Sequence, residues 1–140
     1  MRRILFRGKT VDTNEWIEGS LVRALGYLVE DEKFFIIPED ALYYNHGEFD
    51  IVKEIRRETI GQYTGLTDKN GTKIFEGDIL RVVGCYFDVI YRNSGFVWRD
   101  MKLNKFVNYA DSDSNIEQFS FVEVIDNIHD NLKLLKGGKE

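Results

Sequence analysis

The residues whose types and spacing come nearest to a catalytic pattern are Glu76 and Asp78, which flank Gly77. Residues two apart on a regular strand face the same side. Such a pair can hold a hard metal ion or divide the roles of general acid and base. A tight turn gathers the same residue types, because glycine permits the bend and carboxylates accept hydrogen bonds from nearby amides. We interpret the segment as a structural bend and predict no catalytic residue in it.

A second acidic pattern resembles a calcium loop at Asp111, Asp113 and Asn115. An EF-hand loop needs glycine at its sixth position and a bidentate glutamate at its twelfth. The chain has Ile116 and Val122 at those two places. The pattern therefore indicates a solvated polar loop, and we predict no metal site there.

Histidine and cysteine offer no recognisable ligand set either. His46 and His129 have no partner at the spacing of a zinc site, and Cys85 is the only cysteine. A small buried thiol is the ordinary expectation for Cys85, at the start of a strand. We predict no metal, no cofactor and no enzymatic activity.

One segment interleaves stacking groups with cations, a combination that single-strand nucleic-acid binders on small β-barrels use. The same alternation also suits a strand whose aromatic residues belong to the core, and the net charge of −5 opposes nucleic-acid binding. The segment is therefore a candidate surface for nucleic acid or for a protein partner. Its residues are Tyr91, Arg92, Phe96, Trp98, Arg99, Lys102, Lys105 and Phe106.

Composition bounds the class of protein. The chain has 140 residues, 43% of them hydrophobic, and no apolar run approaches the ~20 residues of a membrane span. A single cysteine suits a reducing compartment, and the apolar part of the N-terminus is too short for a signal peptide. We expect a cytoplasmic protein with no membrane association. From residue 106 to 130 there are carboxylates and no Lys or Arg.

The elements that must position these residues read as short strands. Valine, isoleucine and aromatic residues recur in runs broken by Gly, Asn and Asp. Asn70-Gly71 suits the positive φ angles of a tight hairpin turn, and Gly77 suggests a bulge or bend. Strands are expected at 1–6, 15–22, 27–29, 34–37, 58–63, 79–83, 86–91, 96–98 and 119–128, with a short helix at 131–136.

This pattern predicts a mainly β fold, a small and partly open barrel or sandwich of antiparallel strands and hairpins with at most one or two short helices. The length fits one domain or two small lobes that share a core. We predict a single domain over residues 1–140, in which an N-terminal β lobe at 1–60 would pack on a barrel-like lobe at 61–130, with a loose tail at 137–140.

The run from Gly61 to Leu80 resembles the signature of the YopX-like proteins, a phage and prophage family of unknown function. Ile4 to Lys9 resembles the opening strand of that family, and Val122 to Asn131 resembles its closing strand. Asp126 and His129 depart from the pattern, where the family usually has glycine and an aromatic residue. The resemblance implies a β-rich fold and a phage or prophage origin, and it implies no catalytic residues.

Two functions follow as expectations. The first is a non-catalytic protein-interaction module that acts in the host cytosol as a homo-oligomer and binds an unknown host or phage protein, since aromatic-rich β surfaces with charged rims suit protein interfaces. The second is a small β-barrel that binds single-stranded nucleic acid through the basic-aromatic segment.

Overall fold

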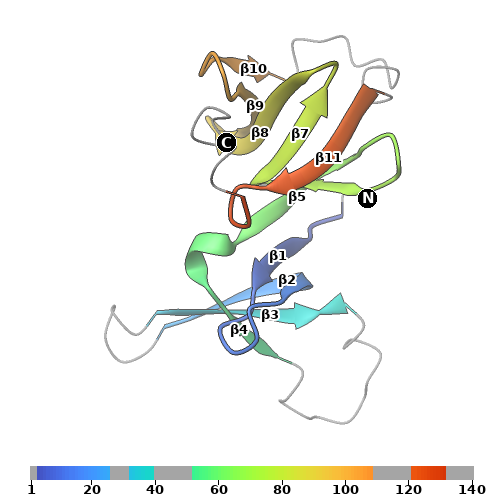
Figure 1. Cartoon of the computed structure of the whole chain (residues 1–140). Helices are drawn as coiled ribbons and strands as arrows, with labels where there is room; N and C mark the ends of the chain where they lie inside the picture. Colours follow the sequence, from blue (N-terminus) through green and yellow to red (C-terminus); the bar gives the residue numbers. More distant parts are fainter. Residues whose placement is uncertain (1–2, 26–31, 40–51, 109–120, 132–140) are drawn as a thin grey trace. The chain divides into compact units, whose positions relative to one another are not determined.

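A computed structural model describes residues 3–25, 32–39, 52–108 and 121–131, and it divides the chain into two compact units at residues 1–63 and 64–140. The sequence places its lobe boundary nearby, between residues 60 and 61. Figure 1 shows the strands of both units. Every strand pairing recorded among the described residues is antiparallel. The prediction of a mainly β fold built from short antiparallel strands and hairpins is confirmed.

The first unit contains β1 (Phe6–Lys9), β2 (Trp16–Ala24), β3 (Lys33–Pro38), β4 (Lys53–Ile55), the 3₁₀ turn η4 (Arg57–Thr59) and the start of β5 (Gly61–Thr67). The strands are hydrogen-bonded in the order β4-β3-β2-β1-β5. The N–H of Val11 also donates to the carbonyl of Glu54 at 3.0 Å, so the sheet curls and the end of β1 meets β4. Ile36 and Ile55 are buried in this unit.

Two glycines let the backbones of this unit approach closely. A Cβ at Gly19 would lie 2.0 Å from the carbonyl oxygen of Ile37, and one at Gly8 would lie 2.2 Å from the side chain of Ile55. Pro38 ends β3, as expected for a residue that cannot donate to the ladder.

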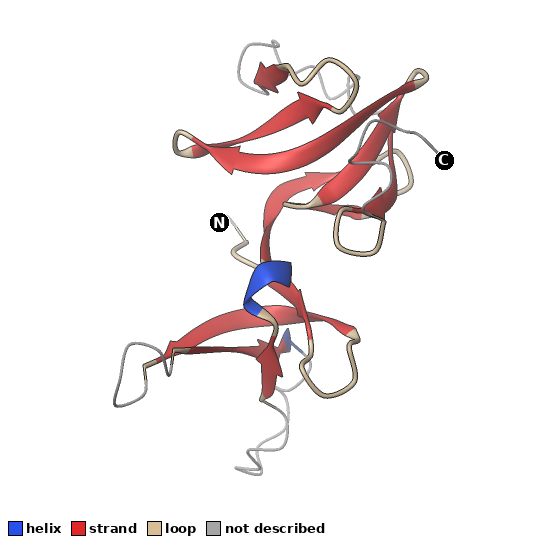
Figure 2. Ribbon diagram, turned by 60° about the vertical axis from the view of Figure 1, so that its left-hand side comes forward, coloured by secondary structure: helices blue, strands red, loops and turns tan. Residues whose placement is uncertain are grey.

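Two boundaries in this unit differ from the sequence prediction. The first strand begins at Phe6 rather than at the N-terminus. Residues 57–59 form the 3₁₀ turn, which Figure 2 draws as a blue coil, although an alternating strand was predicted from Glu58. The hydroxyl of Thr59 donates to the carbonyl of Arg56 at 2.7 Å, and this local bond competes with an extended chain. The predicted strand at 27–29 lies outside the described residues.

The second unit contains the rest of β5, β6 (Lys73–Phe75), β7 (Asp78–Val82), β8 (Cys85–Arg92), β9 (Gly95–Asp100), β10 (Phe106–Asn108) and β11 (Val122–Asn127). Its main sheet has the order β10-β9-β8-β7-β11, and these strands lie side by side in Figure 1. β6 pairs with β5. The predicted helix at 131–136 and the predicted tail lie almost entirely outside the described residues.

The core of the second unit covers one face of the main sheet. Directly paired residues of antiparallel strands share a face. Leu80 pairs with Phe87, and Val89 pairs with Trp98, so these four side chains point to one side. A buried cluster forms there, with partly buried residues packed against it: Ile74, Leu80, Val89 and Val122, surrounded by Leu66, Val82, Phe87, Phe96, Trp98 and Val124. We call the opposite side of the sheet the outer face.

Candidate partner-binding surface

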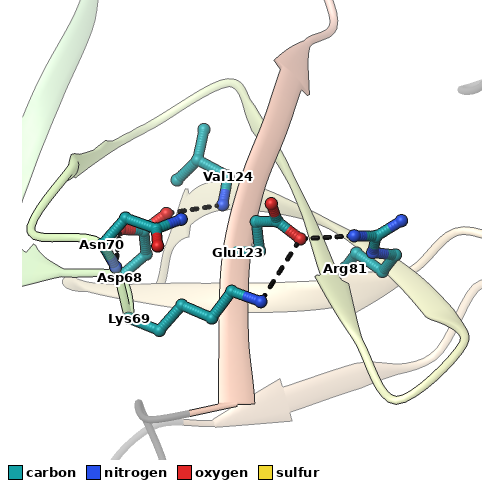
Figure 3. Close-up of polar contacts among 6 residues, drawn as sticks. All are labelled: Asp68, Lys69, Asn70, Arg81, Glu123 and Val124. Atoms are coloured by element: carbon teal, nitrogen blue, oxygen red, sulfur yellow. Dashed lines mark hydrogen bonds and ion pairs between the residues drawn. The ribbon is translucent and has the colours of Figure 1, made fainter.

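The turn between β5 and β6 is organised by the carboxylate of Asp68. One of its oxygens accepts the N–H groups of Asn70 and Thr72, at 2.8 and 2.9 Å. The other accepts the N–H of Val124 in β11, at 2.9 Å (Figure 3). Burial raises the pKa of Asp68, but these hydrogen bonds outweigh it and hold the pKa below the ordinary value. Gly71 has a positive φ of 79°, whereas Asn70 is not among the residues with positive φ.

The same turn occupies the outer edge of β11. The N–H of Lys69 donates to the carbonyl of Val122 at 3.0 Å, next to the bond from Val124 to Asp68. Figure 3 shows Glu123 of β11 between Arg81 and Lys69, whose ammonium lies 3.6 Å from the carboxylate. The hydrogen bond from Arg81 and the charge of Lys69 lower the pKa of Glu123. The turn thus satisfies backbone groups that an edge strand leaves open.

Gly77 bends the chain between β6 and β7 with a φ of 92°. Its N–H donates to the carbonyl of Val89, and its carbonyl accepts the N–H of Ile128, both at 2.8 Å. Asp78 is buried, and its carboxylate accepts the N–H of Phe75 at 2.7 Å, while Glu76 is half-buried. The Asp78 carboxylate therefore binds the backbone of the bend.

The structure divides the basic-aromatic segment between the two faces of the main sheet. Trp98 is half-buried and packs on Phe87 with ring centroids 5.9 Å apart, so it belongs to the core face. Tyr91 pairs with Phe96 at the end of the same face, where their rings meet edge to face at 5.1 Å. Tyr91 remains exposed.

The arginines of the segment lie on the outer face and differ in their partners. Arg99 forms a bidentate ion pair with Asp88, at 2.9 and 2.7 Å, and the Asp88 side chain is fully buried. Arg92 stacks over the ring of Phe106, its guanidinium carbon 4.1 Å from the centroid. Arg99 is therefore neutralised, whereas Arg92 keeps its charge beside an exposed aromatic ring.

The two lysines of the segment lie in and beside the turn that joins β9 to β10. The carboxylate of Asp100 accepts the N–H groups of Lys102 and Leu103, and the N–H of Asp100 donates to the carbonyl of Lys105 at 2.7 Å. This network fixes the turn and leaves the side chains of Lys102, Leu103 and Lys105 exposed. The structure thus places Arg92 in contact with Phe106 on the outer face, whereas Trp98 lies on the core face. Lys102 and Lys105 come four residues and one residue before Phe106 in the chain.

The expectation for Cys85 is wrong: its side chain is exposed. Val83 and Gly84 both have positive φ and form the tip of the β7–β8 hairpin, so Cys85 lies at the end of the sheet, beyond the core.

Within the described ranges, no three His, Cys, Asp or Glu side chains are grouped to hold a metal ion. His46 and the loop at 111–115 lie outside those ranges, and the ring of His129 lies against Gly77.

Several exposed apolar residues of the second unit were missed from the sequence: Val83, Tyr86 and Phe121. Pairing explains the position of Tyr86, which lies opposite Arg81 on the outer face. Alternation along β8 would have assigned Tyr86, Asp88 and Arg92 to one side. Nothing in the sequence signals that Asp88 pairs with Arg99.

These features define a class of protein: a mainly β chain of two small units, in which backbone-binding carboxylates organise the turns and the exposed aromatic residues of the described part lie in the second unit. The chain belongs to the YopX protein family, whose signature it matches over residues 5–136. The resemblance predicted from Gly61–Leu80 is therefore confirmed.

A solved structure shares this fold. The crystal structure of protein EF1440 from Enterococcus faecalis is 26% identical, covers 96% of this chain and 99% of its own, and superposes with a TM-score of 0.58. No curated protein matches the chain. In the described part of the chain, no helix has the length and hydropathy to cross a membrane.

Proposed function

We propose that the chain is a non-catalytic protein-interaction module of phage or prophage origin that acts in the host cytosol. The observation that carries the proposal is the distribution of exposed aromatic side chains. The described residues contain four large aromatic residues at high exposure, namely Tyr86, Tyr91, Phe106 and Phe121, and all four belong to the second unit. Tyrosine, phenylalanine and arginine are enriched at protein interfaces, and exposed apolar patches mark interaction sites.

Two arginines of the outer face, Arg81 and Arg99, favour a protein partner. Arg81 pairs with Glu123 and Arg99 pairs with Asp88, so these cations are held in place and neutralised. A nucleic-acid binder instead needs cations that can reach phosphates.

Affinity capture tests the proposal in a lysate of Enterococcus faecalis, the organism of the similar crystal structure. The test variant carries Tyr86→Ser, Phe106→Ser and Phe121→Ser. A matched control carries Ile4→Ser, Val22→Ser and Leu25→Ser, three exposed apolar residues of the first unit.

We expect one protein to be retained by the parent and by the control and to be absent from the test variant. Equal retention by all three proteins, or no retained protein, contradicts the proposal. Circular dichroism must show that both variants fold.

We also propose that the chain forms a homo-oligomer, since exposed aromatic residues on a sheet face suit an isologous contact. Light scattering measures the mass directly. A monomer mass at high protein concentration removes this part of the proposal.

Single-stranded nucleic acid is the second candidate, favoured by the contact of Arg92 with Phe106 and by the exposed Lys102 and Lys105 shortly before Phe106 in the chain. Fluorescence titration of labelled oligonucleotides at low salt tests it, because phosphate contacts release counterions and weaken as salt rises. If micromolar protein shows no salt-dependent binding, this candidate is discarded.

A further inference from the structure

The two edge strands of the main sheet in the second unit, β11 and β10, differ in whether their outer backbone groups are hydrogen-bonded. At one edge, the Asp68 turn binds the N–H of Val124 and the carbonyl of Val122, so β11 offers these groups to no other strand. At the other edge lies β10, which pairs with β9 alone. Among the described residues, none hydrogen-bonds to the outer side of β10. An unpaired edge of this kind is a template for an added strand.

Register determines which backbone groups face that edge. The N–H of Asp100 donates to the carbonyl of Lys105, so these two residues form a hydrogen-bonded pair. Such pairs alternate with non-hydrogen-bonded ones along an antiparallel ladder. The next pair, Phe106 with Arg99, is therefore of the second type. The N–H and carbonyl of Phe106 point away from β9, toward the free edge.

The charges beside the free edge have one sign. Lys102 and Lys105 are exposed and contact no carboxylate of the described residues, and the same holds for Arg92, which stacks on Phe106. The carboxylate of Asp100, at the start of the β9–β10 turn, accepts two N–H groups of that turn. The edge thus combines open backbone groups, three cations and an exposed aromatic ring.

We propose that the β10 edge binds an extended, acidic segment of a protein partner as an added strand. This proposal rests on the proposed function and specifies its partner. Backbone hydrogen bonds to Phe106 supply affinity, and the alternate carboxylates on one face of the added strand meet Arg92 on the outer face. Lys105 lies opposite Asp100 and so faces the other side of the sheet, and it adds positive charge beside the edge together with Lys102. The methylene groups of these acidic side chains pack on the ring of Phe106, which shares the outer face with Arg92 and is 45% exposed.

The geometry favours an acidic peptide over a nucleic acid. Stacking of bases needs open aromatic faces. One face of Phe106 is covered by the Arg92 guanidinium, and Trp98 lies against the core. The net charge of −5 also repels a dense polyanion more strongly than a short peptide.

The experiment uses a fluorescent peptide in which glutamate and valine alternate, with two competitors: the same peptide with lysine in place of glutamate, and oligothymidine. Anisotropy is measured with the full chain and with an Arg92→Glu/Lys105→Glu variant. A matched control, Lys33→Glu/Lys53→Glu, makes the same change of net charge at exposed lysines of the first unit. We expect about tenfold weaker binding to the edge variant than to the control.

Strand addition has its own variant pair. Phe106→Pro removes the outward N–H without touching the ladder to β9, and proline is tolerated at such an edge position. Phe106→Leu keeps the N–H and an apolar side chain. We expect the proline variant to lose binding and the leucine variant to retain most of it.

Equal binding by the two Phe106 variants overturns strand addition, and equal binding by the two charge variants overturns the acidic partner. Stronger binding of oligothymidine, or of the lysine peptide, also overturns it. Each of these results leaves the captured protein of the lysate experiment intact, so failure here is distinct from failure of the proposed function.

Discussion

Asp68→Asn removes a charge that three backbone N–H groups share. The parent carboxylate accepts hydrogen bonds from Asn70 and Thr72 with one oxygen and from Val124 with the other. Asparagine keeps a single acceptor oxygen, and its amide NH₂ must then face at least one N–H donor. Either the turn or the N–H of Val124 is then left without an acceptor.

The expected cost follows from these bonds. A hydrogen bond to a charged group contributes about 1.5–3 kcal/mol, and a buried donor without a partner costs about 1–3 kcal/mol. Because one N–H no longer has an acceptor and the others bind a neutral oxygen, Asp68→Asn should lower the free energy of unfolding of the second unit by about 3 kcal/mol. Asp12→Asn is the matched control, because Asp12 is exposed and its carboxylate accepts the N–H of the next residue, Thr13. It should cost less than about 1 kcal/mol.

The pH dependence tests the same contact. Because the folded-state pKa of Asp68 lies below its ordinary value of 3.8, the carboxylate contributes stability above that value, and this stability is lost as the pH falls through the folded pKa. The gap between parent and Asp68→Asn should stay constant from neutral pH down to about pH 5 and narrow below 3.8.

Urea unfolding followed by tryptophan fluorescence measures the effect. The chain has two tryptophans, Trp16 in the first unit and Trp98 in the second. A Trp16→Phe background therefore reports on the second unit for Asp68→Asn, and a Trp98→Phe background reports on the first unit for Asp12→Asn. If Asp68→Asn unfolds within about 0.5 kcal/mol of the parent at neutral pH, the carboxylate does not hold β11 and the reasoning fails.

Three further substitutions test the bend, the buried pair and the hairpin tip. Gly77→Val should lower the melting temperature, because Gly77 has a φ of 92° and a Cβ would lie 3.3 Å from His129; an unchanged melting temperature would show that the bend is not strained. Arg99→Ala should cost about 3 kcal/mol in urea unfolding by leaving the buried Asp88 without its partner, and adding Asp88→Leu should recover part of the loss; no recovery contradicts this account. Val83→Asn should stabilise the second unit by up to about 1 kcal/mol, since Val83 has a φ of 47° and is 83% exposed, and a lower melting temperature would refute that.

Local chemistry in the sequence predicts the turns of the second unit. Gly71, Gly77 and Gly84 all have positive φ, and the Asn93–Ser94 turn joins β8 to β9. These signals are local, because glycine and asparagine tolerate the left-handed region that such turns require. Val83 was missed because a β-branched residue at positive φ breaks that rule.

Strand boundaries in the first unit depend on tertiary contacts that no local signal reveals. β1 begins at Phe6, the first residue with a recorded partner on both sides: Phe6 pairs with Gly19 on one side and with Gln62 on the other. Ile4 has strand propensity yet is exposed. Propensity describes a residue, whereas pairing depends on chain segments far away in sequence.

In the basic-aromatic segment, the sequence predicts the strands correctly but does not predict which side chains are available for binding. Alternation places Trp98 and Arg99 on opposite faces of β9, and this follows from sequence alone. The sequence alone does not show which face of β9 is covered, because that depends on how the rest of the second unit packs. The neutralisation of Arg99 depends on Asp88, eleven residues earlier, through the register of the β8–β9 hairpin. The free cations could be separated from the paired ones only after that register was fixed.

The two edges of the main sheet connect the family signature with the proposed partner. The signature turn places Asp68 and Lys69 against β11, and closing that edge prevents strand addition there. With β11 closed, an added strand has β10 as its remaining site on this sheet within the described residues, and the cations of the β9–β10 turn lie beside it. The signature turn thus affects partner binding indirectly, by leaving β10 as the edge for strand addition. Asp68→Asn should open the β11 edge as well, and strands could then add there without any dependence on the cations near β10. Light scattering at rising concentration should then show a larger mass for Asp68→Asn than for the parent, and Arg92→Glu/Lys105→Glu should not suppress the difference. An Asp68→Asn protein with the same mass as the parent would show that the turn stabilises the fold without blocking strand addition at its edge.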